Sequence, residues 1–148
     1  MIGCYVHDCY GPTQYTVGLH TAIDNIIANC DFGIYVYDQG MCVGNTVYNC
    51  TNYGIKKNDY AVITNNIIVD CVVGMTGTNN GNPSSYSDFN CFYNTADHED
   101  DTDVHEGPHS IYADPKLNDP ANGDFTLQGG SPCFDSGMQH TSDTTGVA

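Results

Sequence analysis

Lys56 is the residue whose type and spacing are best suited to binding chemistry. The interval along the chain from Tyr35 to Lys56 equals the interval from Tyr37 to Asn58. If this interval is one turn of a repeating structure, the four side chains lie side by side on two neighbouring turns. Tyrosine rings combine apolar area with a hydroxyl group. The predicted ligand-binding residues, suited to a sugar, are therefore Tyr35, Tyr37, Lys56 and Asn58. The alternative interpretation of Lys56 is a solvated lysine at the edge of a strand.

Carboxylates are plentiful, but their spacing indicates chemistry only weakly. Hydrolysis of a glycosidic bond needs two carboxyl groups at a fixed separation, one of them with a raised pKa. Asp38 and Asp59 lie in predicted turns one repeat apart. Nothing in the sequence shows how the pKa of either side chain would be raised, so the pair is a weak candidate.

The densest acidic run covers 97–106, in a predicted loop. Closely spaced carboxylates are hard oxygen ligands of the kind that Ca²⁺ takes. The candidate calcium ligands in this run are Asp97, Asp100, Asp101 and Asp103. The EF-hand pattern, with its central glycine and terminal glutamate, is absent, and a solvated loop is the alternative interpretation. The histidines in and near this run lack a spacing that would orient them around a transition metal.

A repeating framework would position these side chains. A similar block of sequence occurs at 25–34, 45–55 and 66–75, with a degraded copy at 5–11. The period is therefore roughly 20 residues, and a fixed period of this length is typical of a solenoid. The repeats of a solenoid stack because none of them can bury its apolar face alone.

Each repeat has the punctuation of strands rather than helices. Short runs of β-branched and aromatic residues alternate with Asn, Asp and Gly, and no run shows helical spacing of apolar residues. In the clearest repeat the predicted strands are 25–30, 33–37 and 41–43, with a turn at 38–40. Three strands in so short a repeat predict an all-β, single-stranded parallel β-helix. A leucine-rich repeat would need more than the three leucines present.

Positions that align between repeats have predictable structural roles. Two apolar columns are expected to point inward and form the core. One consists of Ile27, Val47 and Ile68, with Val6 as a fourth member, and the other of Ile34, Ile55 and Met75. A glycine column predicts a turn at which a Cβ would clash or φ must be positive. Its members are Gly33, Gly54 and Gly74.

Polar columns complete the repeat. Asparagine tolerates left-handed geometry, and its amide can bond to the coils above and below. The column predicted to form such an asparagine ladder is Asn25, Asn45 and Asn66. A second polar column consists of Asp8, Asn29, Asn49 and Asp70. These residues are all assigned structural roles.

Four of the eight cysteines form another column. They are Cys9, Cys30, Cys50 and Cys71. Neighbouring coils lie about 4.8 Å apart, which suits a disulfide, but parallel stacking points the Cβ atoms in the same direction. We therefore expect a buried ladder of free thiols. No pair has the CxxC spacing of a zinc site, so metal binding by these cysteines is not expected.

Charge and length limit the possible partners and the number of domains. A formal net charge of −15, with only three lysines and no arginine, argues against nucleic acid and anionic membranes as partners. The length fits one β-helix domain over 1–148. Its predicted parts are repeat coils at 1–94, an acidic loop at 95–110, a closing coil at 111–137 and a tail at 138–148.

The sequence starts inside a repeat. It shows neither the features of a signal peptide nor the capping unit that the end of a solenoid needs. The favoured interpretation is the carboxy-terminal part of a longer protein. The alternative is a homo-oligomer, in which a second copy covers the amino-terminal coil.

Several motifs resemble a known family. In 33–47 and in 54–68, Gly-Ile begins one strand, and Asn precedes another strand further along the same stretch. The segments 87–93 and 113–137 are similar to the last coils and the closing segment of the same proteins. Over roughly residues 4–137 the chain thus resembles the pectate-lyase-like, right-handed parallel β-helix proteins.

The resemblance implies a right-handed coil, an extracellular location and a polysaccharide ligand, but no particular active site. Lyases of this family use Ca²⁺ to neutralise a uronate carboxylate and an Arg or Lys as base, which makes Lys56 the candidate catalytic residue. Its pKa would have to lie well below the ordinary lysine value of about 10.4. We expect a non-catalytic, carbohydrate-associated module. The alternatives are a Ca²⁺-dependent polysaccharide lyase and a structural, self-assembling solenoid.

Overall fold

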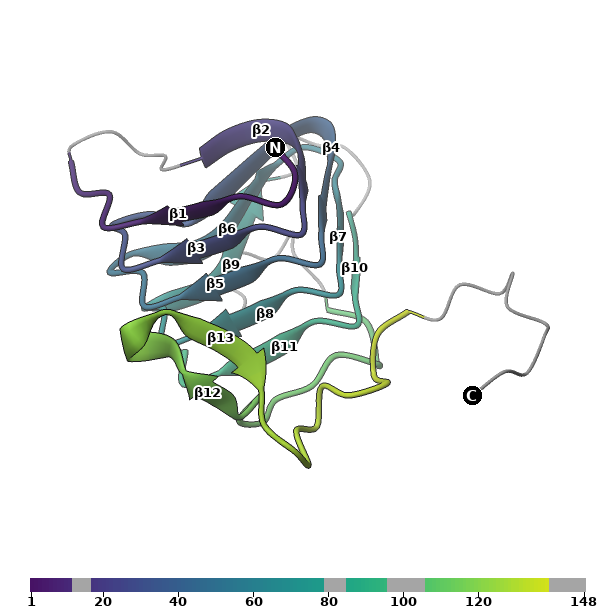
Figure 1. Cartoon of the computed structure of the whole chain (residues 1–148). Helices are drawn as coiled ribbons and strands as arrows, with labels where there is room; N and C mark the ends of the chain where they lie inside the picture. Colours follow the sequence, from purple (N-terminus) through teal and green to yellow (C-terminus); the bar gives the residue numbers. More distant parts are fainter. Residues whose placement is uncertain (12–16, 79–84, 96–105, 139–148) are drawn as a thin grey trace.

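The chain folds as a parallel β-helix of about four turns, as the sequence predicts. The computed structural model describes residues 1–11, 17–78, 85–95 and 106–138. Figure 1 shows the coils stacked one on another, with the amino terminus at one end of the stack and a hairpin packed near the other. Within the described ranges, no helix is long and apolar enough to cross a membrane.

Two parallel sheets and one antiparallel hairpin make up the structure. The first sheet has the order β1 (Tyr5–His7), β3 (Ile26–Ala28), β5 (Thr46–Tyr48), β8 (Ile67–Val69) and β11 (Cys91–Tyr93). The second contains β2 (Val17–Ile23), β4 (Ile34–Val43), β6 (Tyr53–Asn58), β7 (Val62–Thr64), β9 (Val73–Thr78) and β10 (Tyr86–Asp88). The hairpin joins β12 (Leu117–Asp119) to β13 (Asp124–Leu127) through the short 3-10 helix η1 (Pro120–Asn122).

The predicted strand limits need two corrections. The strand expected at 25–30 is confined to β3, because Asn29 has a left-handed φ of 53° that ends the extended backbone. The turn expected at 38–40 does not interrupt the strand. Instead β4 runs through it with φ values of 50° at Asp38 and 61° at Gln39, so the strand bends there. It pairs with β6 before the bend and with β7 after it.

Both predicted apolar columns form the core. Their fully buried members are Ile27, Val47, Ile68, Ile34, Ile55 and Met75. Val6 packs against this cluster from the first coil, and Phe92 takes the equivalent position in the last coil, in register with Ile68. The core is narrow, so each coil contributes only a few side chains to it, and its burial depends on the neighbouring coils.

The asparagine ladder is confirmed, and it extends to a fourth residue. The amide Nδ2 of each asparagine donates to Oδ1 of the next coil's asparagine, at 2.9 Å from Asn25 to Asn45, 2.9 Å from Asn45 to Asn66 and 3.0 Å from Asn66 to Asn90. The same Oδ1 atoms also accept from the backbone N–H of the preceding member at 3.0 Å. The ladder therefore satisfies a continuous row of buried backbone donors.

Left-handed backbone lies beside the ladder rather than within it. The residues that precede the ladder asparagines have φ values of 53° at Asp24, 67° at Gly44, 59° at Asn65 and 60° at Phe89. The second polar column is also left-handed, and its members are Asp8, Asn29, Asn49 and Asp70. Asn, Asp and Gly tolerate this conformation, whereas a bulky residue such as Phe89 is strained by it.

The glycine column is explained by close approach of the coils, since none of its members has a positive φ. A Cβ on Gly33 would lie 1.9 Å from the carbonyl oxygen of Gly54. A Cβ on Gly54 would lie 2.8 Å from the carbonyl oxygen of Gly74. Of the two reasons predicted for this column, steric clash applies.

The closing segment, residues 111–137, adds little to the coil itself. Ile111 makes one isolated parallel bridge to Cys91. The chain then folds back, and the ring of Phe125 in β13 lies 5.8 Å from those of Tyr5 and Tyr48. In Figure 1 the hairpin lies in front of the first sheet. Much of the segment predicted as a closing coil thus covers the outside of this sheet.

Replacing Asn45 with Ala tests the contribution of the ladder. The variant leaves the backbone N–H of Asn25 without its acceptor inside the protein and removes one of the two acceptors of its side-chain amide. We therefore expect a loss of about 2–4 kcal/mol in the free energy of unfolding. Urea denaturation followed by circular dichroism measures it. Asn52→Ala, at an exposed position, is the matched control and should change stability by less than about 0.5 kcal/mol. Equal losses in the two variants would contradict a structural ladder.

Replacing Gly33 with Ala tests the close approach of the coils. Because the new methyl group overlaps the carbonyl of Gly54, we expect a destabilisation of about 3 kcal/mol or more, seen as a lower Tm. The control is Gly129→Ala, where a Cβ meets no heavy atom within 4 Å. A Gly33→Ala variant as stable as this control would show that the coils can separate without cost.

Candidate functional site

The predicted ligand-binding residues lie on the outer face of the second sheet. Tyr35 of β4 pairs in register with Lys56 of β6, which in turn pairs with Thr76 of β9. Their chain neighbours Ile34 and Ile55 are buried, so strand alternation turns Tyr35 and Lys56 outward. Both side chains are half-buried and remain accessible from solvent.

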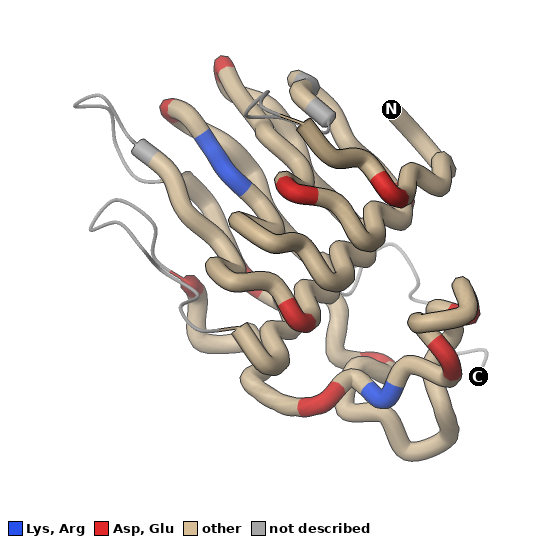
Figure 2. The backbone as a smooth tube through the Cα atoms, turned by 90° about the vertical axis from the view of Figure 1, so that its left-hand side faces the viewer, with Lys and Arg blue, Asp and Glu red and all other residues tan. Residues whose placement is uncertain are grey.

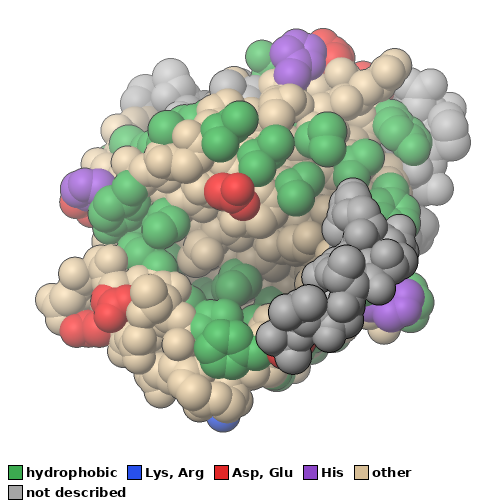
Figure 3. Space-filling view, turned by 45° about the vertical axis from the view of Figure 1, so that its right-hand side comes forward, with side chains coloured by type: hydrophobic (Ala, Val, Ile, Leu, Met, Phe, Trp, Pro, Cys, Tyr) green, Lys and Arg blue, Asp and Glu red, His purple; other side chains and the backbone are tan. Residues whose placement is uncertain are grey.

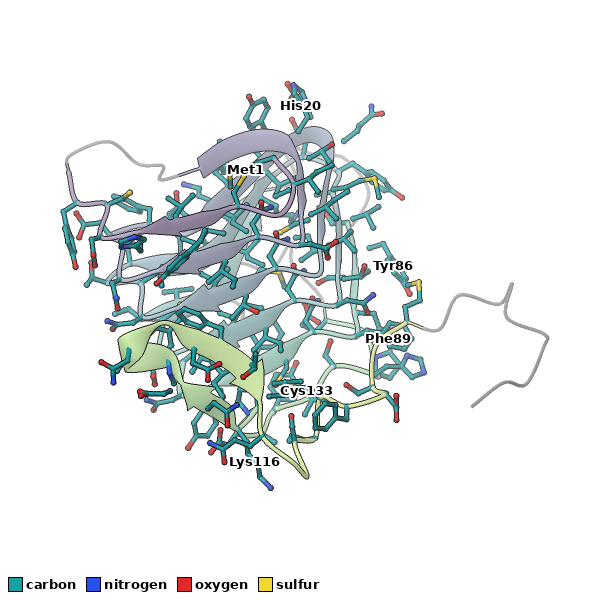
Figure 4. All side chains as sticks on the ribbon, in the orientation of Figure 1. Met1, His20, Tyr86, Phe89, Lys116 and Cys133 are labelled. Carbon is teal, nitrogen blue, oxygen red and sulfur yellow. The ribbon has the colours of Figure 1, made fainter. Side chains whose placement is uncertain are left out.

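Aromatic rings continue on both sides of this pair and form a row. The Tyr35 ring lies 5.7 Å from that of Tyr37, which lies 4.5 Å from the ring of His20. Beyond Lys56, the ring of Tyr53 lies 5.2 Å from that of Phe32. His20, labelled in Figure 4, marks one end of the row at the edge of the coils. We call this row the aromatic strip: Phe32, Tyr53, Lys56, Tyr35, Tyr37 and His20.

Lys56 joins the two halves of the aromatic strip. Its Nζ lies 5.8 Å from the ring centroid of Tyr35 and 5.6 Å from that of Tyr53. Both distances fall within the range of a cation–π interaction, which holds the ammonium group near the two rings. Tyr53 itself is only 4% exposed. The accessible part of the strip therefore presents the rings and hydroxyl groups of Tyr35 and Tyr37 together with the charge of Lys56.

The sequence predicted three members of the aromatic strip and missed three. Phe32 and Tyr53 directly precede the column glycines Gly33 and Gly54, so this aromatic column was visible in the repeat. His20 lies in a stretch where the repeat is irregular, and only the structure shows its contact. Asn58, the fourth predicted ligand residue, lies at the end of β6 in register with Thr78 and is half-buried.

Charge is distributed unevenly around the strip. Figure 2 shows the basic segment at Lys56 and Lys57 within the stacked coils, whereas acidic residues lie mainly at strand ends and turns. Asp38 and Asp59, the weak candidates for hydrolysis, both have left-handed backbone, with φ values of 50° and 58°. The pair thus occupies bends of the coil.

Lys57 is fully buried, which the sequence interpretation overlooked. It pairs in register with Val36 on one side and Gly77 on the other. A Cβ on Gly77 would lie 2.3 Å from Cγ of Lys57, so the glycine leaves room for the lysine stem. Its Nζ donates to the backbone carbonyl of Asp59 at 3.5 Å. Strand alternation from Ile55 predicts this inward direction, and the residue has a structural role.

A second polar cluster lies where the last coil meets the closing segment. The buried carboxylate of Asp88 accepts hydrogen bonds from Nδ1 of His109 at 2.7 Å and from the backbone N–H groups of Phe89 and His109, each at 2.9 Å. Burial alone would raise the pKa of Asp88, but these hydrogen bonds outweigh it and lower the pKa below its ordinary value. The Asp88 carboxylate therefore fixes the orientation of the imidazole.

The strained backbone of Phe89 belongs to the same cluster. Its ring, labelled in Figure 4, stacks on that of His109 at 4.6 Å with an interplanar angle of 3°. Strained residues often mark functional positions, but only as an indication. A histidine oriented by a carboxylate is suited to proton transfer, but this contact by itself does not define a reaction centre. The sequence signal was a phenylalanine in a column otherwise occupied by Asp, Gly and Asn.

Glu106 ends the asparagine ladder. Its Oε2 accepts from Nδ2 of Asn90 at 3.2 Å, and its carboxylate also accepts from the hydroxyl groups of Ser87 and Ser110. The backbone N–H of Asn90 donates to Oγ of Ser110 at 3.1 Å. Ser110 thus takes the place that the next asparagine of the ladder would occupy. Glu106 is thus explained by the fold and is not assigned to catalysis.

The predicted calcium ligands, Asp97, Asp100, Asp101 and Asp103, lie outside the described residues. Among the residues that are described, no group of three or more His, Cys, Asp or Glu side chains is arranged to hold a metal ion. The calcium site therefore stays a prediction from sequence.

Comparison with protein-family models, with curated proteins and with solved structures finds no match. The fold is established by the structure alone, and the pectate-lyase-like assignment remains a prediction.

Replacing Asp88 with Asn tests the Asp88–His109 contact. We expect the variant to lose about 1–3 kcal/mol of unfolding free energy at pH 7, because charge-assisted hydrogen bonds are lost. The folded-state pKa of Asp88 lies below the unfolded value, which is near 3.8. The advantage of the wild type is therefore complete above about pH 4 and disappears as pH falls through the lowered pKa. Urea denaturation of both proteins from pH 7 to 3 measures it, and an advantage that grows on acidification would contradict the prediction.

Proposed function

We propose that this chain is a glycan-binding module that uses the aromatic strip as its binding face. The observation that supports this is the pair of partly accessible rings, Tyr35 and Tyr37, beside Lys56 on the outside of the second sheet. The stacking of the coils explains the buried side chains, but it does not require aromatic residues on an accessible face. Rings that carry hydroxyl groups suit a ligand that is both apolar and hydroxylated.

The favoured ligand is a neutral polysaccharide. Sugar rings have apolar faces that can lie on tyrosine rings and hydroxyl groups that can hydrogen-bond to tyrosine, lysine and asparagine side chains. The formal net charge of −15 opposes an acidic polymer. This repulsion is screened beyond about 8 Å at physiological ionic strength, so it weakens binding of a polyanion without forbidding it. The single charge of Lys56 is already in contact with two rings.

The sequence resemblance to pectate-lyase-like β-helix proteins supports a polysaccharide ligand and an extracellular location, and both remain parts of this proposal. The shared architecture by itself supports neither a reaction nor a substrate. No residue of the strip is assigned a catalytic role, since Lys56 has no described partner group that would complete a reaction centre.

Alanine variants of the strip test the binding face. We expect Tyr35→Ala and Tyr37→Ala each to weaken binding to a neutral glycan about tenfold, equivalent to about 1.4 kcal/mol, because each removes one ring from the face. Binding is measured by a glycan array and then by calorimetry with the best ligand. The control is Tyr86→Ala, which removes a more exposed tyrosine from β10, on the right of Figure 4 and away from His20.

Other results would redirect or remove the proposal. An array without hits, or equal losses in Tyr37→Ala and Tyr86→Ala, would exclude the strip as a glycan site. Binding confined to acidic polymers and lost in Lys56→Ala would change the ligand class to uronates. Ca²⁺-dependent formation of unsaturated product, lost in Lys56→Ala, would favour the lyase over the binding module.

A further inference from the structure

Cys91 lies outside the cysteine column and points away from the core. It is in β11, where its neighbour Phe92 belongs to the core cluster, so strand alternation directs Cys91 to the outer face. Cys91 is nevertheless only 3% exposed, because the closing segment lies over this end of the sheet. Its Sγ donates to the backbone carbonyl of Ala113 at 3.4 Å. Ala113 belongs to the closing segment that covers Cys91.

Cys133 faces Cys91 from the closing segment. Both residues line a cavity of about 250 Å³ between the last coils and this segment, together with Asn65, Phe89, Leu127 and Ser136. The two thiols lie near enough to interact with each other. Figure 3 shows the surface hollowed between the coils and the closing segment, and Cys133 is labelled in Figure 4. The cysteines thus belong to two separate layers that meet face to face.

This arrangement differs from that of the cysteine column. Cys50 and Cys71 also contact each other, but they are stacked side by side in parallel coils and are almost fully buried. Parallel stacking points their Cβ atoms in the same direction, which opposes disulfide geometry. Cys133, by contrast, is only half-buried and belongs to the closing segment rather than to a parallel coil.

The two thiols also differ in acidity. The hydrogen bond from Cys91 lowers the pKa of Cys133, a hydrogen bond from Ser131 acts in the same direction, and partial burial opposes both. The same contact and burial raise the pKa of Cys91. Because the thiolate is the reactive form, Cys133 is the more reactive member of the pair.

We propose that Cys91 and Cys133 form an oxidative modification site, in which a low-molecular-weight disulfide converts the two thiols into a disulfide that fixes the closing segment to the last coil. This inference is independent of the proposed glycan site, since it involves no residue of the aromatic strip.

The reaction proceeds by two thiol–disulfide exchanges. The Cys133 thiolate attacks one sulfur of the small disulfide, which forms a mixed disulfide and releases the first small thiolate. The Cys91 thiol then loses its proton and attacks the Cys133 sulfur, which releases the second small thiolate. The two protein thiols are oxidised, the small disulfide is reduced to two thiols, and the two protons lost by the cysteines are taken up by the two leaving thiolates.

The cross-link closes a long loop between β11 and the closing segment. By limiting the unfolded chain, such a link raises Tm by about 10 °C for a domain of this size. The link would also hold the hairpin against the first sheet, where Phe125 packs on Tyr5 and Tyr48.

The test treats the folded full chain with oxidised glutathione, blocks free thiols with N-ethylmaleimide and maps the peptides. Cleavage after lysine gives a peptide 117–148 whose only cysteine is Cys133. A link between this peptide and 58–116 therefore shows that Cys133 is bonded to Cys71 or to Cys91. Further cleavage at Asp88 separates Cys71 from Cys91. We expect a Cys91–Cys133 link, a higher Tm in the oxidised protein, and loss of both in Cys133→Ser and Cys91→Ser. The matched control Cys4→Ser, at an exposed cysteine, should keep both.

Three results would overturn the proposal. One is a stable glutathione adduct on Cys133 while Cys91 remains free. Another is a link from Cys133 to Cys71, or a Cys50–Cys71 link in place of the expected one. The third is that both thiols of the pair remain open to alkylation after oxidation.

Discussion

The fold depends on the satisfaction of buried backbone donors at one corner of every coil. The asparagine amides do this from Asn25 to Asn90, each accepting from the preceding coil and donating to the next, and all four asparagines are buried. A buried polar group without a partner costs free energy, so one defective coil weakens its neighbours on both sides. Glu106 and Ser110 end the series with oxygen acceptors, and the last asparagine is therefore also satisfied.

The close stacking of the coils limits which side chains fit at inward positions, but it sets few limits on those at outward positions. Gly33 has no room for a Cβ, and inward positions hold aliphatic side chains that fit between those of adjacent coils. Outward positions need only be compatible with a parallel strand. Tyr35, Tyr37 and Lys56 of the aromatic strip occupy such positions, as do Cys91 and the residues covered by the hairpin. Ligand recognition and attachment of the closing segment can therefore change without altering the core.

Features that repeat with the coil were predictable from sequence. The columns led by Ile27 and Ile34, the asparagine ladder and the alignment of Tyr35 with Lys56 all follow from one period. The local course of the backbone was harder to predict. Asp38 and Gln39 read as a turn, yet β4 continues through them, because two left-handed residues can bend a strand while hydrogen bonds to the adjacent coil continue on both sides. The burial of Lys57 follows from alternation together with the space left by Gly77.

By itself, then, the sequence determined the architecture, the inward columns and the face that carries Tyr35, Tyr37 and Lys56, because each depends on residues one period apart. The tertiary structure decided which non-repeating residues meet. Asp88 contacts His109 because the coil continues, one period further along the chain, through 106–111. Cys91 meets Cys133 only because the chain then folds back over the first sheet. No period relates Cys91 to Cys133. The proximity of Cys91 and Cys133 depends on how a segment with little regular structure packs against the finished stack, and spacing along the chain does not encode this.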